Sequence, residues 1–185
     1  MRFIAAMILL ITALPGLYAQ QQSQPPALKE HFGEADDPVN EYLNTSLAPI
    51  RENFKKINAT KQWKQVKSVN IEKGEGGTAR FYYAGSGLQK IAARQFGEMS
   101  QLLSEYYLLH GKLSFVYETE MRYQQPFDTA GAEIITTRSY FSNDHLAHQL
   151  NSEDCGAPFS SDYLEEERKR LYESYGQLLQ LVKER

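Results

Sequence analysis

The fold is decided by a pattern that is clearest in LLSEYYLLHGKLSFVY, residues 102–117, where an aromatic pair, a short polar turn and a leucine follow one another. The pattern occurs three times between about Thr78 and Leu150: Tyr82-Tyr83 to Leu88, Tyr106-Tyr107 to Leu113, and Tyr140-Phe141 to Leu146. Aromatic runs suit strands, and turns containing Gly, Asn or Ser connect them, so each copy predicts a β-hairpin. The copies begin about 24 and 34 residues apart, which indicates an irregular meander and not a strict repeat array.

Strand-like runs extend outward from these hairpins on both sides. Short linkers separate them, so strands that are neighbours in sequence are expected to be neighbours in one antiparallel sheet. We predict a strongly curved meander of about seven strands. Its expected strands are 63–73, 78–84, 88–94, 102–109, 112–123, 132–142 and 145–150.

Helices are expected on both flanks of the sheet. Apolar residues recur at three- and four-residue steps between Val39 and Ile57, as on one side of a helix. Pro49 interrupts this run, so the prediction is a short helix near 39–46 and a second near 49–58. At the other end, Asp162 and Glu165 have the spacing of a capping pair before a long carboxyl-terminal helix. The predicted fold class is therefore α+β, a curved antiparallel β-meander with N-terminal helices and a C-terminal helix.

The amino terminus has the features of an export signal. Arg2 is followed by an apolar run of about 12 residues, by Pro15-Gly16 and by the small residue Ala19, which predicts a signal peptide over residues 1–19 with cleavage after Ala19. The apolar run is shorter than the roughly 20 residues that span a bilayer, and no transmembrane segment is expected after cleavage. We therefore expect a periplasmic or secreted protein.

The remaining chain is expected to hold a flexible leader and one domain. Residues 20–38 are rich in Gln and Pro, which predicts a leader in which His31 has no visible partner. Residues 39–185 then form a single α+β domain. Removing residues 1–19 would change the formal net charge from −3 to about −4, because Arg2 is the one charged residue among them. Acidic and basic residues are interspersed, which argues against a nucleic-acid partner.

No catalytic, cofactor-binding or metal-binding residue is assigned from the sequence. His145 and His148 lie three apart on a predicted strand, a spacing that points them to opposite faces. Cys155 is the single cysteine, so no intramolecular disulfide can form. Glu118 and Glu120 share a strand face and would lie roughly 6–7 Å apart, a distance that acid and base catalysis could use.

The preferred interpretation of these two acids is a solvated sheet face. There they would pair with Arg122 and with cross-strand residues such as Lys90 or Arg94. The same strand is expected to place Leu113, Phe115, Tyr117, Met121 and Tyr123 on its opposite face.

Adjacent aromatics such as Tyr82-Tyr83 and Tyr106-Tyr107 put one ring on each sheet face. Helices could cover these rings, or one face could be a tyrosine-lined surface that binds a peptide, a protein or an envelope ligand. The favoured function is a non-enzymatic, exported binding or envelope-associated protein that uses its sheet surface. The alternatives are a hydrolase-type enzyme with acids on the Glu118/Glu120 face, and an inhibitor or immunity-type protein acting through the loop from Gln124 to Gly131.

Several local sequences carry a family resemblance over residues 50–150. They are Ile50-Arg51-x-x-Phe54-x-x-Ile57-Asn58, Phe96-Gly97-Glu98, Glu105-Tyr106-Tyr107 with Gly111-Lys112-Leu113-x-Phe115-Val116, and Arg138-x-Tyr140-Phe141-x-Asn143. In these features the chain resembles uncharacterised exported bacterial proteins built on a β-meander. The resemblance implies the fold and the compartment, and it implies no catalytic residue.

Overall fold

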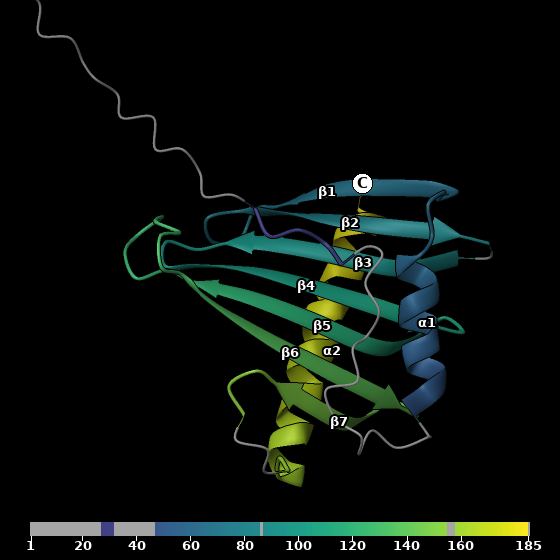
Figure 1. Ribbon diagram of the computed structural model, residues 1–185. Coiled ribbons are helices and arrows are strands. Elements are labelled where there is room, and N and C mark those ends of the chain that lie inside the picture. Colours follow the sequence, from purple (N-terminus) through teal and green to yellow (C-terminus); the bar gives the residue numbers. More distant parts are fainter. Residues whose placement is uncertain (1–26, 32–46, 86, 155–157, 185) are drawn as a thin grey trace, which may run out of the picture.

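One antiparallel sheet with a helix on each face forms the protein in the computed structural model, which describes residues 27–31, 47–85, 87–154 and 158–184 (Figure 1). Within this part of the chain the sheet has seven strands, and their order in the sheet is their order in sequence. The strands are β1 (Gln65–Ile71), β2 (Gly77–Ala84), β3 (Gly87–Phe96), β4 (Ser100–Leu109), β5 (Lys112–Arg122), β6 (Glu133–Ser142) and β7 (His145–Asn151). The predicted α+β meander is confirmed.

The two helices begin close to where the sequence predicts. Helix α1 (Ala48–Asn58) has Pro49 in its first turn, where the missing backbone N–H costs no hydrogen bond. The helix expected near 39–46 lies outside the described residues. Helix α2 (Ser161–Lys183) is capped by Ser160, whose hydroxyl accepts a hydrogen bond from the Tyr163 backbone N–H. The cap therefore lies two residues before Asp162, the residue predicted for it. Among the described residues no helix is long and apolar enough to cross a membrane.

The three hairpins of the aromatic pattern share a β-bulge at the same place. In each, the pairing slips by one residue just before the turn, so that one residue on the second strand is unpaired. The slips follow the pairs Tyr82↔Lys90, Tyr107↔Phe115 and Tyr140↔His148, and the next pairs are Tyr83↔Leu88, Leu108↔Leu113 and Phe141↔Leu146. Bulges bend a strand and increase its twist, so this end of the sheet, where α1 lies, is curved (Figure 1).

The bulge in β5 also corrects one sequence prediction. Leu113 packs in the cluster beneath α2, whereas Phe115 and Tyr117 pack on the opposite face beneath α1. Strict alternation predicts all three on one face, and this is wrong because the unpaired Ser114 between Leu113 and Phe115 reverses the alternation.

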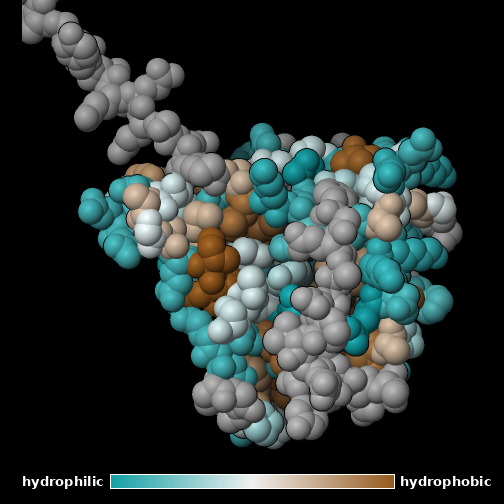
Figure 2. Space-filling view, viewed as in Figure 1, coloured by the Kyte–Doolittle hydropathy of each residue, from teal (hydrophilic) through white to brown (hydrophobic). Residues whose placement is uncertain are grey.

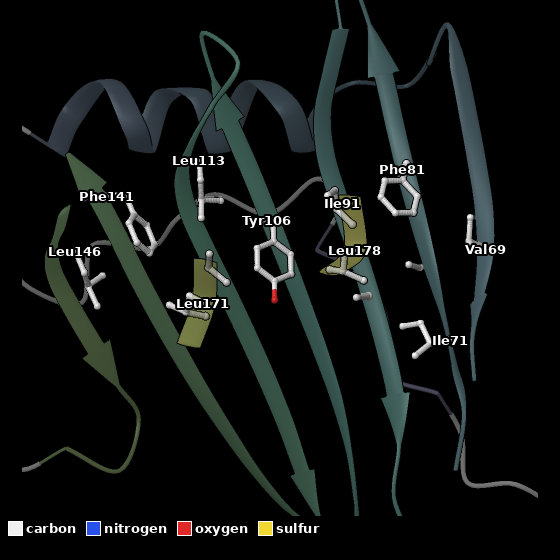
Figure 3. Close-up of a cluster of buried hydrophobic side chains, with 13 residues drawn as sticks. Val69, Ile71, Phe81, Ile91, Tyr106, Leu113, Phe141, Leu146, Leu171 and Leu178 are labelled. Carbon is white, nitrogen blue, oxygen red and sulfur yellow. The ribbon is translucent and has the colours of Figure 1, made fainter. Parts of the chain in front are cut away.

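Helix α2 covers one face of the sheet and encloses the larger apolar core. Leu171 and Leu178 of the helix are buried against Ile91, Tyr106 and Phe141 of the strands (Figure 3). The helix crosses behind the sheet in Figure 1 and comes nearest to the two edge strands, β7 and β1. The sheet therefore curves around α2.

The other face carries α1 and the short segment 27–31. Phe54 and Ile50 of α1 pack on Tyr107, Phe115 and Tyr140. Polar and apolar side chains are intermixed on this side of the molecule (Figure 2). The prediction that each aromatic pair divides between the faces is confirmed, since Tyr106 lies in the core beneath α2 and its neighbour Tyr107 lies beneath α1.

Candidate functional site

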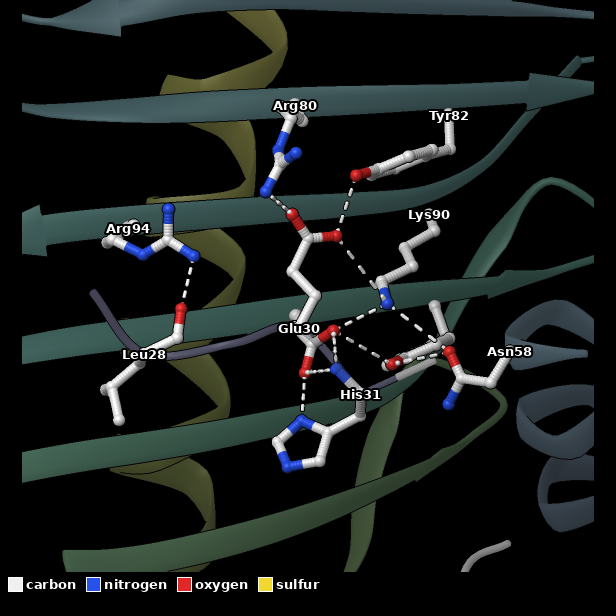
Figure 4. A network of polar contacts seen from close by, with 10 residues as sticks. Leu28, Glu30, His31, Asn58, Arg80, Tyr82, Lys90 and Arg94 are labelled. Carbon is white, nitrogen blue, oxygen red and sulfur yellow. Dashed lines mark hydrogen bonds and ion pairs between the residues drawn. The ribbon is translucent and has the colours of Figure 1, made fainter. Parts of the chain in front are cut away.

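Residues 27–31 lie along the sheet face and are held there by side chains (Figure 4). The Gln101 side-chain oxygen accepts a hydrogen bond from the Leu28 backbone N–H at 3.0 Å, and the Arg94 guanidinium donates to the Leu28 carbonyl oxygen. Glu105 accepts from the His31 backbone N–H at 3.1 Å. His31 was expected to have no partner, and this prediction is wrong because its backbone and ring both bind Glu105. The predicted signal peptide and the rest of the predicted leader lie outside the described residues.

Glu30 anchors the segment through its carboxylate. The carboxylate forms an ion pair with Arg80, accepts a hydrogen bond from the Tyr82 hydroxyl at 2.7 Å and lies 3.9 Å from the Lys90 ammonium. Its side chain is only 3 % exposed, so these contacts replace the water that a surface glutamate would keep. Burial and the hydrogen bond to Glu30 together raise the pKa of Tyr82, which therefore acts as a donor here.

A fully buried ion pair between Lys90 and Glu105 lies beside Glu30. The Lys90 ammonium is 2.5 Å from Glu105 Oε1, and both side chains are 0 % exposed. Lys90 also donates to Asn58 Oδ1 at 3.3 Å, and the Tyr107 hydroxyl lies 3.3 Å from Glu105 Oε1. The second carboxylate oxygen of Glu105 binds the Nδ1 of His31.

These residues form one connected group, which we call the polar cage. Its members share hydrogen bonds or ion pairs with Lys90, Glu105 or the Glu30 carboxylate. They are Glu30, His31, Asn58, Arg80, Tyr82, Lys90, Glu105 and Tyr107. Aromatic rings enclose it, because His31 stacks on Tyr117 at 4.1 Å between centroids and the Lys90 ammonium lies 5.0 Å from the centre of the Tyr107 ring.

The register of the sheet brings the strand residues of the cage together. Two neighbouring rows of laterally paired residues run across it on the face that carries α1. The row next to the bulges contains Tyr82, Lys90, Tyr107, Phe115, Tyr140 and His148. The next row contains Arg80, Ala92, Glu105, Tyr117, Arg138 and Leu150. Lys90 was predicted on a solvated face, and this is wrong because segment 27–31 and α1, which the strand sequence does not reveal, cover it.

The pKa of Glu105 depends on burial and on its neighbours His31 and Lys90. Burial alone raises the pKa of this carboxyl, but the hydrogen bond from His31 and the charge of Lys90 outweigh burial, and the pKa lies below its ordinary value of 4.5. Glu105 is therefore an ionised acceptor that holds His31 and Lys90 in place.

This lowered pKa predicts a loss of stability in acid. A carboxyl whose folded pKa is below its unfolded value adds stability above that unfolded value, and the contribution is lost as the pH falls through the folded pKa. We expect the free energy of unfolding of the native chain to fall more steeply below about pH 4.5 than that of Glu105→Gln. Urea unfolding at a series of pH values from 7 to 3 measures the free energy of unfolding of both proteins. If it fell equally with pH in both, Glu105 would not have a lowered pKa in the folded protein. His31, Lys90 and Tyr107 are the titratable groups that contact the Glu105 carboxylate, and Tyr117 and Tyr82 lie beside it.

The acids Glu118 and Glu120 lie on the opposite face from the cage. They line a cleft of about 310 Å³ between the sheet and the first half of α2. Glu118 accepts two hydrogen bonds from Arg170 of α2, at 3.1 and 2.6 Å, and one from Ser104 at 3.2 Å, while Glu120 binds Arg122.

The prediction of a solvated sheet face is wrong for Glu118, which is 7 % exposed because Arg170 of α2 covers it, and the expected partners of the two acids are corrected in part. Arg122 is a partner of Glu120, as predicted. Lys90 and Arg94 are not partners, because alternation along β3 places both on the face that carries segment 27–31. The arginine that binds Glu118 comes from α2, which strand pairing could not indicate.

The remaining positions considered in the sequence, the loop from Gln124 to Gly131 and the histidines of β7, are not members of the polar cage. The loop from Gln124 to Gly131 is closed by a hydrogen bond between these two residues at 3.2 Å, and Phe127 binds the Glu98 carbonyl oxygen. His145 and His148 belong to β7, and in the part of the chain that the structure describes no group of three His, Cys, Asp or Glu residues could hold a metal ion. Cys155 lies outside the described residues.

Comparison with known proteins gives no match to any protein family, curated protein or solved structure. The function must therefore be inferred from the contacts of the site.

Proposed function

We propose that this is a non-enzymatic, exported binding protein whose sheet face recognises an extended acidic peptide segment, and that residues 27–31 are its intramolecular occupant. One observation carries the proposal: side chains of the sheet bind both the backbone of this segment and its single carboxylate. Export is supported by the signal-peptide features of residues 1–19.

The contacts define what the site would recognise. Gln101, Arg94 and Glu105 bind backbone atoms of Leu28 and His31, which any extended peptide also offers. The carboxylate of Glu30 is selected by a guanidinium, a phenol and an ammonium, all aimed at the same two oxygens. Hydrogen bonds between charged partners are stronger than neutral ones, so the acidic side chain would supply most of the selectivity.

Charge balance favours an acidic occupant. Arg80, Lys90, Arg94 and Arg138 lie on this face, and Glu105 is the buried counter-charge of Lys90. A buried cation without enough counter-charge is costly, and Glu30 reduces that cost for the fully buried Lys90 while also pairing with the exposed Arg80. A partner bearing a carboxylate in the same position could replace Glu30 without changing the charge of the site.

The test is a competition between the tethered segment and a free copy of it. A tethered segment has an effective concentration in the millimolar range, so it masks the site in the native chain. We expect an acetylated and amidated peptide of residues 27–31 to bind full-length Glu30→Ala at least tenfold more tightly than it binds the native chain. Titration of the labelled protein by NMR, followed at the amides of β3 and β4, measures the affinity.

Two controls make the test specific. A peptide with alanine in place of its glutamate should not bind Glu30→Ala, and Glu133→Ala, which changes an exposed acid on β6, should bind as weakly as the native chain. Equal affinity of the native and Glu30→Ala proteins for the acidic peptide, with both folded by circular dichroism, would refute the proposal.

A further inference from the structure

A second cavity lies on the opposite side of the sheet from the polar cage. It has a volume of about 320 Å³ and lies between the second half of α2 and strands β1, β3 and β4. This volume is at the lower end of the range typical of small-molecule sites. The cavity shares no residue with the polar cage, and the proposed peptide site does not use it.

The cavity follows from the way α2 is held over the sheet. The helix approaches the edge strands β1 and β7 most closely, so the central strands lie further from it. Ala93 of β3 is 5 % exposed and offers only a methyl group beneath the helix. Tyr106 keeps the helix in position, because its buried hydroxyl is 2.9 Å from the Ser174 hydroxyl. Ile71, Tyr106 and Leu178 belong to the same layer (Figure 3).

The lining suits a molecule with an apolar body and one uncharged polar group. Ile71, Ala93, Leu178 and Leu181 supply an apolar wall. The uncharged polar groups of the lining can each donate and accept hydrogen bonds; they are the hydroxyls of Ser104, Tyr106 and Ser174 and the amides of Gln95, Gln177 and Gln180.

The charged side chains of the lining lie at its mouth. Glu72, Lys73 and Glu184 are all exposed, so the charged groups of the described lining lie away from the buried hydroxyl of Tyr106. Among the described lining residues Lys73 is the one cation, so an anionic head group at the Tyr106–Ser174 pair would lose its hydration without a cationic partner beside it. This separates the expected ligand from fatty acids and other anionic amphiphiles.

We infer that this cavity is a binding site for a small neutral amphiphile, with its hydrocarbon body against Ala93 and Leu178 and its hydroxyl or amide at the Tyr106–Ser174 pair. The site is independent of the proposed peptide recognition, so either can fail without the other.

The experiment uses the neutral fluorescent probe N-phenyl-1-naphthylamine with the full-length protein. We expect a saturable rise in fluorescence that 1-octanol reverses at a concentration at least tenfold lower than octanoate does, since the two share a chain length and differ in charge. Absence of a saturable signal would overturn the site, and equal displacement by octanoate would overturn the assignment to a neutral ligand.

Two variants locate the probe. Ala93→Leu fills the cavity from the sheet and Leu181→Trp fills it from the helix, and each should reduce probe affinity at least tenfold. Lys169→Trp places the same ring on an exposed position of α2 outside the cavity and should bind the probe as the native chain does. Because Ala93→Leu could disturb the core, Leu181, which is only partly buried, provides the second route. Unchanged affinity in both folded variants would place the probe elsewhere and overturn the inference.

Discussion

Replacing Lys90 by methionine is expected to lower the free energy of unfolding by about 3–5 kcal/mol, the usual cost of removing one partner from a buried ion pair. Methionine has nearly the length of lysine and fills the same space, so the loss reports charge and hydrogen bonding more than packing. The change leaves Glu105 fully buried without its ammonium partner. Urea denaturation at pH 7, followed by circular dichroism, measures it.

A second substitution separates the buried charge from the rest of the effect. Adding Glu105→Gln to Lys90→Met removes the carboxylate that has lost its ammonium partner, and we expect the double variant to be more stable than Lys90→Met alone. Lys112→Met is the matched control, because Lys112 also forms an ion pair, with Asp144, but the two side chains are 69 % and 55 % exposed. It should unfold like the native chain. Equal losses of unfolding free energy for Lys90→Met and Lys112→Met would show that burial does not make the Lys90–Glu105 ion pair more important to stability than an exposed pair.

Replacing Phe54 by alanine is expected to cost about 3–5 kcal/mol, as for other buried phenylalanines. Phe54 is 2 % exposed and attaches α1 to the sheet, with its ring centre 4.9 Å from that of Tyr107 and 5.2 Å from that of Phe115. Asn58, the last residue of α1, belongs to the polar cage, so loosening the helix should also disturb Lys90. Denaturation gives the global loss, and hydrogen exchange of the α1 amides reports the local one.

The controls for this position vary size and location. Phe54→Leu keeps most of the apolar volume and should cost less than about 1.5 kcal/mol. Lys55→Ala changes the neighbouring exposed residue on the same helix and should leave the exchange of the α1 amides unchanged. If Phe54→Ala kept native protection in α1, the helix would be held by contacts other than this ring.

The meander could be predicted because its information is local. An aromatic run, a turn and a second strand-like run indicate each of the three hairpins. The predicted strands agree with β1–β7 to within a few residues. Antiparallel neighbours need only a short turn, so the order of strands follows from the short linkers alone. Tyr106 and Tyr107 were predicted on opposite faces because successive strand residues alternate, and this is confirmed.

The bulges were hidden in the same local sequence. Ser114 is an ordinary strand residue by type, and its exclusion from the pairing between β4 and β5 depends on how the hairpin turn closes. The pattern of aromatic pair, turn and leucine did mark the place, since all three copies carry the slip. The pattern could not indicate on which face the leucine after the turn lies. In β5, Leu113 lies on the α2 face and Phe115, two residues further, lies on the α1 face.

By itself the sequence determined the strands, their order and the two flanking helices, because these depend on periodicity and turns within a few residues. The tertiary structure alone decided which charges are buried. Lys90 and Glu105 are 15 positions apart on adjacent strands, and His31 reaches Glu105 from 74 positions away. No local pattern indicates contacts between residues so far apart in the chain. The sequence around a strand lysine is the same whether water or a folded segment covers the side chain. The polar cage exists because register aligns Lys90 with Tyr82 and Tyr107, and because residues 27–31 bring a carboxylate to a face that would otherwise hold more cations than anions.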